Sequence, residues 1–222
     1  MARPSEAPKP PRAPEDCLLE AVRAGTPAAR LRAANEGLAM TPLAKATEVL
    51  LLRQIYTARL EQRRFRQALE ATDRMVAIGV LRDVAMHDAS RAHAALGDFE
   101  RAIAMQRAAA RSAHPARRSF HRWSLATLQH FAGHPDDALS TLQRAMRCST
   151  RDRALLTAHA VYVRLDSGRA ARNAETAVEA LRASPSRDGY GRFLLGMIAY
   201  HQGDEATARE ELGSFVARHE NA

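Results

Sequence analysis

The residues that could perform chemistry in this chain are nine histidines, two cysteines and 25 acidic residues. Catalytic or metal-binding histidines normally occur at a fixed spacing, such as two histidines four residues apart on one helix face. His130 and His134 have this spacing, but Gly133 and Pro135 interrupt the helix that would present them together. The chain also contains no H-E-x-x-H motif, no cysteine-histidine ligand spacing and no G-x-S-x-G motif. We therefore expect neither catalysis nor a bound metal.

The cysteines and the acidic pairs predict no reactive site either. Cys17 and Cys148 form no C-x-x-C motif and no disulfide framework, a pattern typical of reduced thiols in a cytosolic protein. The Asp136-Asp137 pair lies at an expected helix start, where carboxylates interact favourably with the helix dipole. The sequence therefore predicts a protein that is not an enzyme and uses no cofactor.

The elements that position the functional residues are expected to be helices. Apolar residues make up 46% of the chain and aromatic residues only 5%, while alanine, the best helix former, is abundant. Apolar residues recur at spacings of three and four, as in Leu51, Ile55 and Ala58, and no segment alternates as a strand would. Glycine and proline divide the chain into helical segments. The pattern predicts an all-α fold with about eleven or twelve helices.

The beginning of the chain differs from the remainder. Residues 1–15 contain five prolines and little that could be buried, which predicts a disordered tail rich in proline and arginine. Residues 16–222 are expected to form the helical domain. The first residues lack the apolar core of a signal peptide, and no apolar run is long enough to span a bilayer. We expect a cytoplasmic protein without membrane insertion.

The net charge is +8, and only two of the 33 basic residues are lysines. Because the charges are spread along the whole chain, nucleic acid is not favoured as a partner. One segment is more densely basic and contains Arg111, Arg117, Arg118 and Arg122. It is interpreted as a solvated turn, with an acidic protein face or a phosphate as the alternative contact.

A repeat of about 35 residues is visible in the glycines. Its markers are Gly97, Gly133, Gly168 and Gly203, separated by 36, 35 and 35 residues. Each is expected to end one helix in the left-handed conformation, which glycine adopts without a Cβ penalty, so that the next helix turns back. Small residues follow at a constant offset, at Ala68, Ala102, Ala138 and Ala208.

With these features the chain resembles the tetratricopeptide repeat family, whose unit of 34 residues is a helix-turn-helix. The last unit matches through Phe193, Leu195, Gly196, Gly203-Asp204, Ala208 and Leu212. The third matches through Trp123, Leu125, Ala126, Gly133, Ala138, Leu142 and Ala145. The resemblance covers about residues 16–220. It implies a right-handed superhelical solenoid of about five repeats plus an N-terminal partial repeat.

The chain departs from the family pattern at several places. Arg63 replaces the turn glycine of the first unit, and Asn173 stands where the fourth unit should have alanine. Extra residues surround Pro115. The N-terminal partial unit, from Gly25 to Pro42, has a short first helix. These departures affect helix limits and local packing rather than the fold class.

The resemblance implies that the first helix of each unit, here called a first helix, lines a concave groove. This groove receives an extended or helical peptide. In the N-terminal half the groove residues are Arg53, Gln54, Thr57, His87, Asp88 and Arg91. In the C-terminal half they are Trp123, Thr127, His130, His159, Tyr162, Phe193, Met197 and Tyr200. Arginines suit carboxylates, whereas aromatic rings and methionine suit apolar anchors. We expect a partner segment with an acidic and an apolar part, although ordinary packing of these rings within the array stays open.

The sequence thus predicts a protein-protein interaction module, an adaptor or scaffold. The carboxylate-clamp variant of the family is not supported, because only Arg53 and Arg91 are compatible with it and the clamp asparagines are missing. Two alternatives stay open: a dedicated chaperone of a bacterial secretion or assembly system, and a basic regulatory repeat that contacts nucleic acid. A homodimer formed through the terminal repeat, where Leu212, Phe215 and Val216 lack an obvious capping helix, also stays open.

Overall fold

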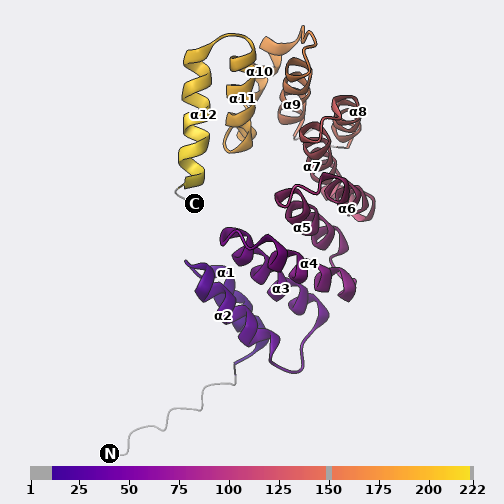
Figure 1. Cartoon of the computed structure of the whole chain (residues 1–222), viewed down its shortest axis with the longest axis vertical. Helices are drawn as coiled ribbons and strands as arrows, with labels where there is room; N and C mark the ends of the chain where they lie inside the picture. The colour runs from indigo at the N-terminus through magenta and orange to yellow at the C-terminus, as the bar shows by residue number, and fades with distance from the viewer. Residues whose placement is uncertain (1–11, 149–151, 221–222) are drawn as a thin grey trace, which may run out of the picture. The chain divides into compact units, whose positions relative to one another are not determined.

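The structure is a computed structural model that describes residues 12–148 and 152–220. This part of the chain forms twelve α-helices and two short 3-10 helices, without a strand (Figure 1). The first six α-helices are α1 (Pro14–Arg23), α2 (Pro27–Leu38), α3 (Lys45–Glu61), α4 (Phe65–Ile78), α5 (Arg82–Ala95) and α6 (Phe99–Ser112). The others are α7 (Arg118–Phe131), α8 (Pro135–Met146), α9 (Arg153–Asp166), α10 (Ala174–Arg182), α11 (Tyr190–His201) and α12 (Glu205–Glu220), and the 3-10 helices are η1 (Pro115–Arg117) and η2 (Pro185–Arg187). The predicted all-α class and helix number are confirmed for these residues.

Helices begin where the sequence places its breaks. The Thr26 side chain accepts a hydrogen bond from the backbone N–H of Ala29 at 3.2 Å, and Pro27 takes the first position of α2. Pro14 starts α1, inside the predicted tail, whose residues 1–11 lie outside the described part of the chain. No described helix is long and apolar enough to cross a membrane.

The predicted turn glycines have the left-handed backbone that the repeat requires. Gly97, Gly133, Gly168 and Gly203 have φ values of 79°, 81°, 71° and 80°. No atom lies within 4 Å of a Cβ placed on any of them, so backbone conformation rather than space selects glycine. Arg63, at the corresponding place between α3 and α4, takes the same conformation with φ 56°. The turn between α3 and α4 therefore departs from the pattern in residue type but not in backbone conformation.

The helices divide into two compact units. Unit 1 contains the described residues up to Ala102, hence α1–α5 and the start of α6. Its core is built from three clusters of buried apolar residues. The first contains Ala21, Ala33, Ala34 and Leu51, the second contains Val49, Leu52, Met75 and Ala85, and the third contains Tyr56, Ala68, Ala71 and Ala92. The small alanines let α1, α2 and α3 approach one another closely.

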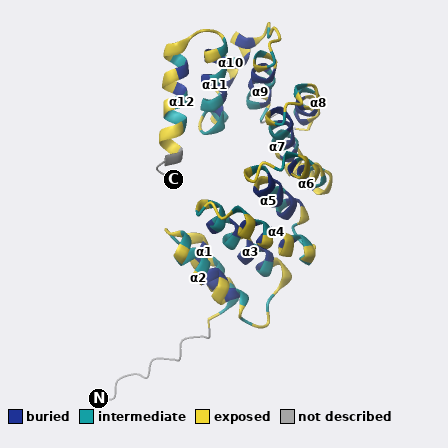
Figure 2. Ribbon diagram, viewed as in Figure 1, coloured by how far each residue is buried: buried dark blue, intermediate teal, exposed yellow. Residues whose placement is uncertain are grey.

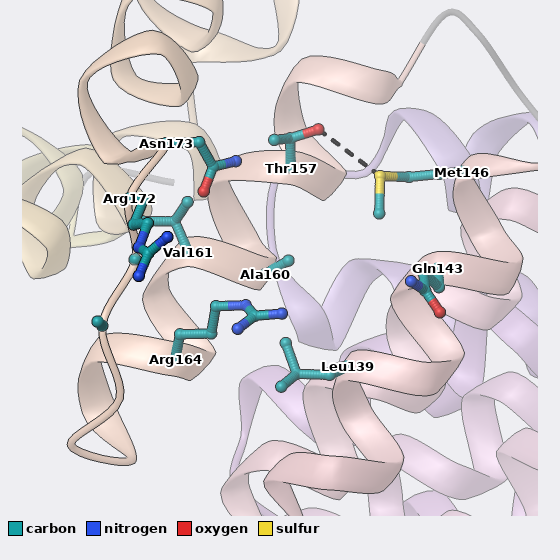
Figure 3. Close-up of a pocket in the computed structure, with 11 residues that line it drawn as sticks. Leu139, Gln143, Met146, Thr157, Ala160, Val161, Arg164, Arg172 and Asn173 are labelled. Carbon is teal, nitrogen blue, oxygen red and sulfur yellow. Dashed lines mark hydrogen bonds between the residues drawn. The ribbon is translucent and has the colours of Figure 1, made fainter.

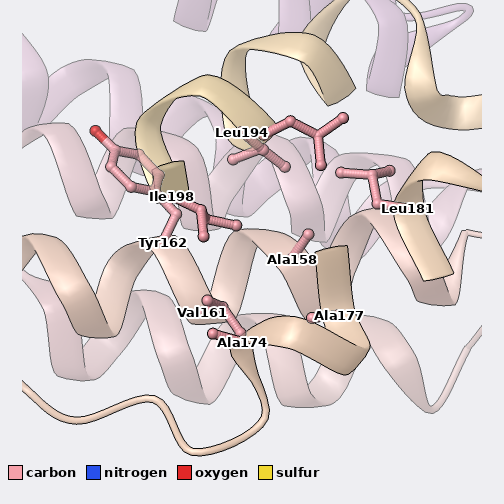
Figure 4. Close-up of a cluster of buried hydrophobic side chains, with 9 residues drawn as sticks. Ala158, Val161, Tyr162, Ala174, Ala177, Leu181, Leu194 and Ile198 are labelled. Atoms are coloured by element: carbon pink, nitrogen blue, oxygen red, sulfur yellow. The ribbon is translucent and has the colours of Figure 1, made fainter. Parts of the chain in front are cut away.

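Unit 2 begins at Ile103 and contains the rest of the described chain. Its largest core cluster joins three helices, with Ala158 and Tyr162 from α9, Leu181 from α10, and Leu194 and Ile198 from α11 (Figure 4). Six of the twelve residues of α11 are buried, whereas α12 is mostly exposed (Figure 2). On α12, the side chain of Val216 is 50% exposed. The predicted homodimer through this end of the chain stays a prediction.

The fourth repeat, formed by α9 and α10, differs from its neighbours because its second helix is short. Whereas α8 and α12 begin two residues after their turn glycines, α10 begins six residues after Gly168, at Ala174. Asn173 is the residue immediately before this helix. Asparagine favours helix ends over helix interiors, which accounts for the late start. The extra residues around Pro115 form η1.

The left-handed Arg63 generates a test of the turn constraint. Replacing it with glycine removes a Cβ penalty of roughly 1–2 kcal/mol, and part of this gain is offset by the greater freedom of glycine in the unfolded chain. We expect Arg63→Gly to raise the free energy of unfolding by about 0.5–1 kcal/mol in urea denaturation followed by circular dichroism. Arg63→Ala keeps the Cβ and serves as the control. An equal gain in both variants would show that the arginine side chain, and not the backbone, is the source of strain.

Candidate functional site

Aromatic rings from α7 and α11 meet across α9 and form one network in unit 2. The ring centroids of Trp123 and Tyr190 are 5.1 Å apart, those of Tyr190 and Phe193 5.1 Å, and those of Phe193 and Tyr162 5.7 Å. The Trp123–Tyr190 and Tyr162–Phe193 pairs meet edge to face, a favourable geometry for aromatic rings. Ala158 lies 35 residues from both Trp123 and Phe193, and Tyr190 packs against the core cluster to which this alanine belongs.

His159 lies fully buried within this network. Its ring centroid is 6.0 Å from that of His130 and 5.6 Å from that of Tyr190. Burial, assisted by the nearby His130, lowers the pKa of His159 to about 3, so its imidazole is neutral in the folded chain. Neither ring nitrogen has a hydrogen-bond partner among the described residues. Burying polar atoms in this way destabilises the fold, and such atoms occur in proteins mainly at sites with a further role.

A carboxylate bridges two histidines at the ends of three successive first helices. Asp166, the last residue of α9, places one oxygen 2.9 Å from His130 Nε2 and the other 3.3 Å from His201 Nε2. Its charge and, more strongly, burial raise the pKa of Tyr162 to about 12. The His130 contact is a hydrogen bond that joins the ends of α7 and α9, whereas His201 Nε2 approaches the carboxylate without forming a hydrogen bond. No group of histidine, cysteine and acidic side chains suited to a metal ion occurs in the described residues.

Two aromatic side chains beside this bridge are exposed. Phe131 is 50% exposed, and its ring stacks on that of His130 with centroids 5.6 Å apart. Tyr200 is 64% exposed, and its ring centroid lies 5.6 Å from that of His201. We call Phe131, Asp166, Tyr200 and His201 the histidine-aromatic surface.

The structure brings most of the predicted C-terminal groove residues together, but at different depths. Trp123 and Phe193 are half-buried in the network, and Met197 is half-buried against the core cluster of α9 and α11. Thr127 donates its hydroxyl to the Trp123 carbonyl at 3.0 Å. His130, His159 and Tyr162 lie below the surface, because their rings pack between the first helices. Tyr200 alone of the eight is exposed.

Sequence reasoning missed Tyr190, Asp166 and Phe131 as site residues. The bridge has a signal in the sequence, because Asp166 is 36 residues from His130 and 35 from His201, close to the repeat period. Tyr190 has no such signal. The position of Tyr190 depends on η2, which precedes α11 and sets the residue at which that helix begins.

The predicted N-terminal groove residues lie on α3 and α5 of unit 1. Arg53 Nε donates to Asp88 Oδ2 at 2.8 Å, so the arginine expected to meet a partner's carboxylate already has one. Burial raises the pKa of Asp88, and the Arg53 charge partly offsets this. Thr57 donates to the Arg53 carbonyl at 3.0 Å. Arg91 is exposed, whereas Gln54 and His87 are half-buried and Asp88 is buried.

The short second helix of the fourth pair leaves a pocket of about 390 Å³ between α8 and α9 (Figure 3). Residues 170–173, which replace the first turn of α10, form one wall. Leu139, Met146 and Val161 line it with apolar surface, and the Thr157 hydroxyl contacts Met146 Sδ at 3.6 Å. This pocket lies outside the predicted groove residues.

The predicted basic segment is brought together only in part. Arg111, Arg118 and Arg122 line one pocket of unit 2, and Arg107 and Arg144 join them. Arg117, on η1, is exposed and is not among the lining residues. Arg107 precedes Arg111 by four residues on α6, a spacing that is visible in the sequence but was not used, whereas Arg144 lies on α8 and has no such signal.

Comparisons with known proteins agree with this architecture. A family model described as tetratricopeptide repeat matches residues 120–144 and 189–214, which lie in the α7–α8 and α11–α12 pairs. The matched segments include Trp123, Asp136, Phe193 and Tyr200. A search of curated proteins finds no match.

Solved structures of similar fold include the apo form of RapI. It aligns with a TM-score of 0.67 at 11% sequence identity, over 96% of this chain and 85% of the RapI chain. At this identity the likeness concerns the fold alone. A TPR repeats protein from Bacteroides fragilis aligns with a TM-score of 0.39 at 14% identity, over 92% of this chain and 90% of its own.

The buried neutral His159 predicts how stability depends on pH. The folded pKa of about 3 lies below the ordinary value of 6.5, so the unfolded chain binds the extra proton between these values and stability falls as pH falls through this window. Between pH 8 and pH 5 this group alone should lower the free energy of unfolding by about 2 kcal/mol. We expect His159→Leu to remove that part of the pH dependence in urea denaturation. His134→Leu, at an exposed position, is the control, and a pH dependence that is unchanged in His159→Leu would contradict the assignment.

Proposed function

Because this chain contains tetratricopeptide repeats, we propose that it binds a peptide or helix of another protein through the histidine-aromatic surface of unit 2. The observation that carries this proposal is the exposure of Phe131 and Tyr200 at the ends of α7 and α11. Both rings lie against histidines beside the Asp166 carboxylate, which hydrogen-bonds to His130 and lies 3.3 Å from His201 Nε2. An aromatic ring fixed before binding loses little conformational freedom when a partner covers it, and such rings dominate many protein interfaces.

The network beneath the surface supports the same function. Trp123, Tyr190, Phe193 and Tyr162 pack ring against ring and give the first helices a rigid base. Asp166, which is exposed, and His201, which is half-buried, add polar groups that can orient a bound segment. Apolar rings beside a few directed polar groups are typical of a surface that recognises a peptide.

The charges of unit 1 support an acidic part in the partner. Arg91 is exposed and forms no ion pair within the described residues. Arg53 is bound to Asp88, so it offers a partner only the guanidinium nitrogens that this bond leaves. We therefore assign the attraction for acidic residues in this unit mainly to Arg91.

The test is capture of the partner with two matched double variants. Phe131→Ala with Tyr200→Ala removes both exposed rings, whereas Leu19→Ala with Val22→Ala removes two exposed apolar side chains from α1. We expect the first variant to retain at least about tenfold less of a protein that the parent captures from native lysate, as measured by quantitative mass spectrometry. The α1 variant should retain it fully.

Equal retention by both variants, with unchanged helicity, would contradict the proposed surface. Retention that falls only in Arg91→Gln would move the binding site to unit 1. If the captured protein is degraded in cells that lack this chain, the interaction is that of a dedicated chaperone. Capture of nuclease-sensitive nucleic acid in place of protein would contradict the proposed function as a whole.

A further inference from the structure

A pocket of unit 2 gathers an unusual number of positive charges. Its volume is about 240 Å³, and it lies between α7, α8 and the part of α6 that follows residue 103. Five of its eight lining residues are arginines: Arg107, Arg111, Arg118, Arg122 and Arg144. The others are Ala110, Leu125 and Thr141, so none of the described residues that line it is acidic.

The arginines are arranged in a way that opposes folding. Arg107 and Arg111 are four residues apart on α6, and Arg118 and Arg122 are four residues apart on α7. Like charges at this spacing repel each other on a helix surface, and here the two pairs also face one pocket. None of the ion pairs formed within the described residues includes any of the five. Within residues 12–148 and 152–220, no ion pair therefore offsets this repulsion.

Neutral groups hold several of these guanidinium groups in position without reducing their charge. Arg122 Nη1 donates to the Arg144 carbonyl at 2.9 Å, and Arg118 Nε donates to the Ala113 carbonyl at 3.2 Å. Arg144 Nη2 donates to the Ser140 hydroxyl at 2.9 Å. Three of the five guanidinium groups are thus positioned before any ligand arrives, which lowers the entropic cost of binding.

A buried contact also fixes the two helices that contribute four of the arginines. Gln106 Nε2 donates to the His121 carbonyl at 3.0 Å, and both residues are buried between α6 and α7. The arginines on these helices therefore keep their relative positions.

We propose that this arginine pocket binds the phosphoryl group of a phosphorylated serine or threonine side chain on a partner protein. A phosphate monoester has a charge of about −1.5 to −2 at pH 7 and three acceptor oxygens, so it can occupy several planar guanidinium groups at once. A carboxylate has one charge and two oxygens and would leave most of the five arginines unpaired. The small apolar residues and Thr141 leave room for the carbon atoms that bear the phosphate.

The arrangement of charge argues against nucleic acid as the ligand. A nucleic-acid backbone has one charge per phosphate and is bound by basic groups distributed along a track. Here the charges converge on a single pocket. The inference takes from the proposed function only that the bearer of the phosphate is a protein, and its test does not involve the histidine-aromatic surface.

The test is calorimetric titration of the full chain with phosphoserine blocked at both ends, beside blocked serine and blocked aspartate at the same ionic strength. We expect phosphoserine to bind at least about tenfold more tightly than aspartate, and serine not to bind. Arg107→Gln with Arg111→Gln should weaken phosphoserine binding by about tenfold or more. Arg209→Gln with Arg218→Gln removes the same charge from α12 and should bind as the parent does.

The Arg107/Arg111 variant also has an internal check on folding. Because it relieves repulsion, its thermal midpoint should be equal to or higher than that of the parent. Equal phosphoserine binding by the parent and this variant, equal binding of aspartate and phosphoserine, or no binding of phosphoserine would each overturn the proposal. A 20-nucleotide single-stranded DNA that binds more than about a hundredfold more tightly than phosphoserine, and loses this binding in the same variant, would assign the pocket to nucleic acid instead.

Discussion

The surfaces of this chain depend on one backbone constraint, a residue in the left-handed conformation two positions after the first helix of each of the five repeats. Arg63 and the four turn glycines satisfy it after α3, α5, α7, α9 and α11. Each second helix then turns back, and the chain starts its next first helix about 35 residues after the last. Side chains one repeat apart therefore meet, as His130, Asp166 and His201 do in unit 2.

The two candidate sites use this arrangement in opposite ways. In the ring network the aromatic side chains stabilise one another by packing. The exposed rings of Phe131 and Tyr200 lie at the edge of this packed region. In the arginine pocket the side chains repel one another, so the folded chain alone gains nothing from their proximity. Elsewhere the chain does compensate charge, since the buried Glu211 lies 3.0 Å from Arg192 and 3.5 Å from Arg187. Against that background, the five arginines of this pocket differ, because none of them has a carboxylate partner within the part of the chain that the structure describes.

The sequence was sufficient to predict the helical class and the turn positions, because glycine and proline act locally and the period repeats. It also identified Trp123, Phe193 and Tyr162, which the structure brings into one network. It did not predict the depth of His159, the late start of α10 or the reach of Tyr190. These features depend on helix lengths and on the size of side chains across a contact, such as Ala158, which no local pattern encodes.

The central claim, that the ends of the first helices in unit 2 contact a partner protein, is tested most directly by photo-crosslinking. The crosslinking residue p-benzoylphenylalanine would replace Tyr200 in one version of the chain and Glu179, exposed on α10, in another. Illumination in native cells should join one protein of defined mass to the Tyr200 position and none to the Glu179 position. No product at the Tyr200 position, or the same product at both positions, would contradict this account of the surface.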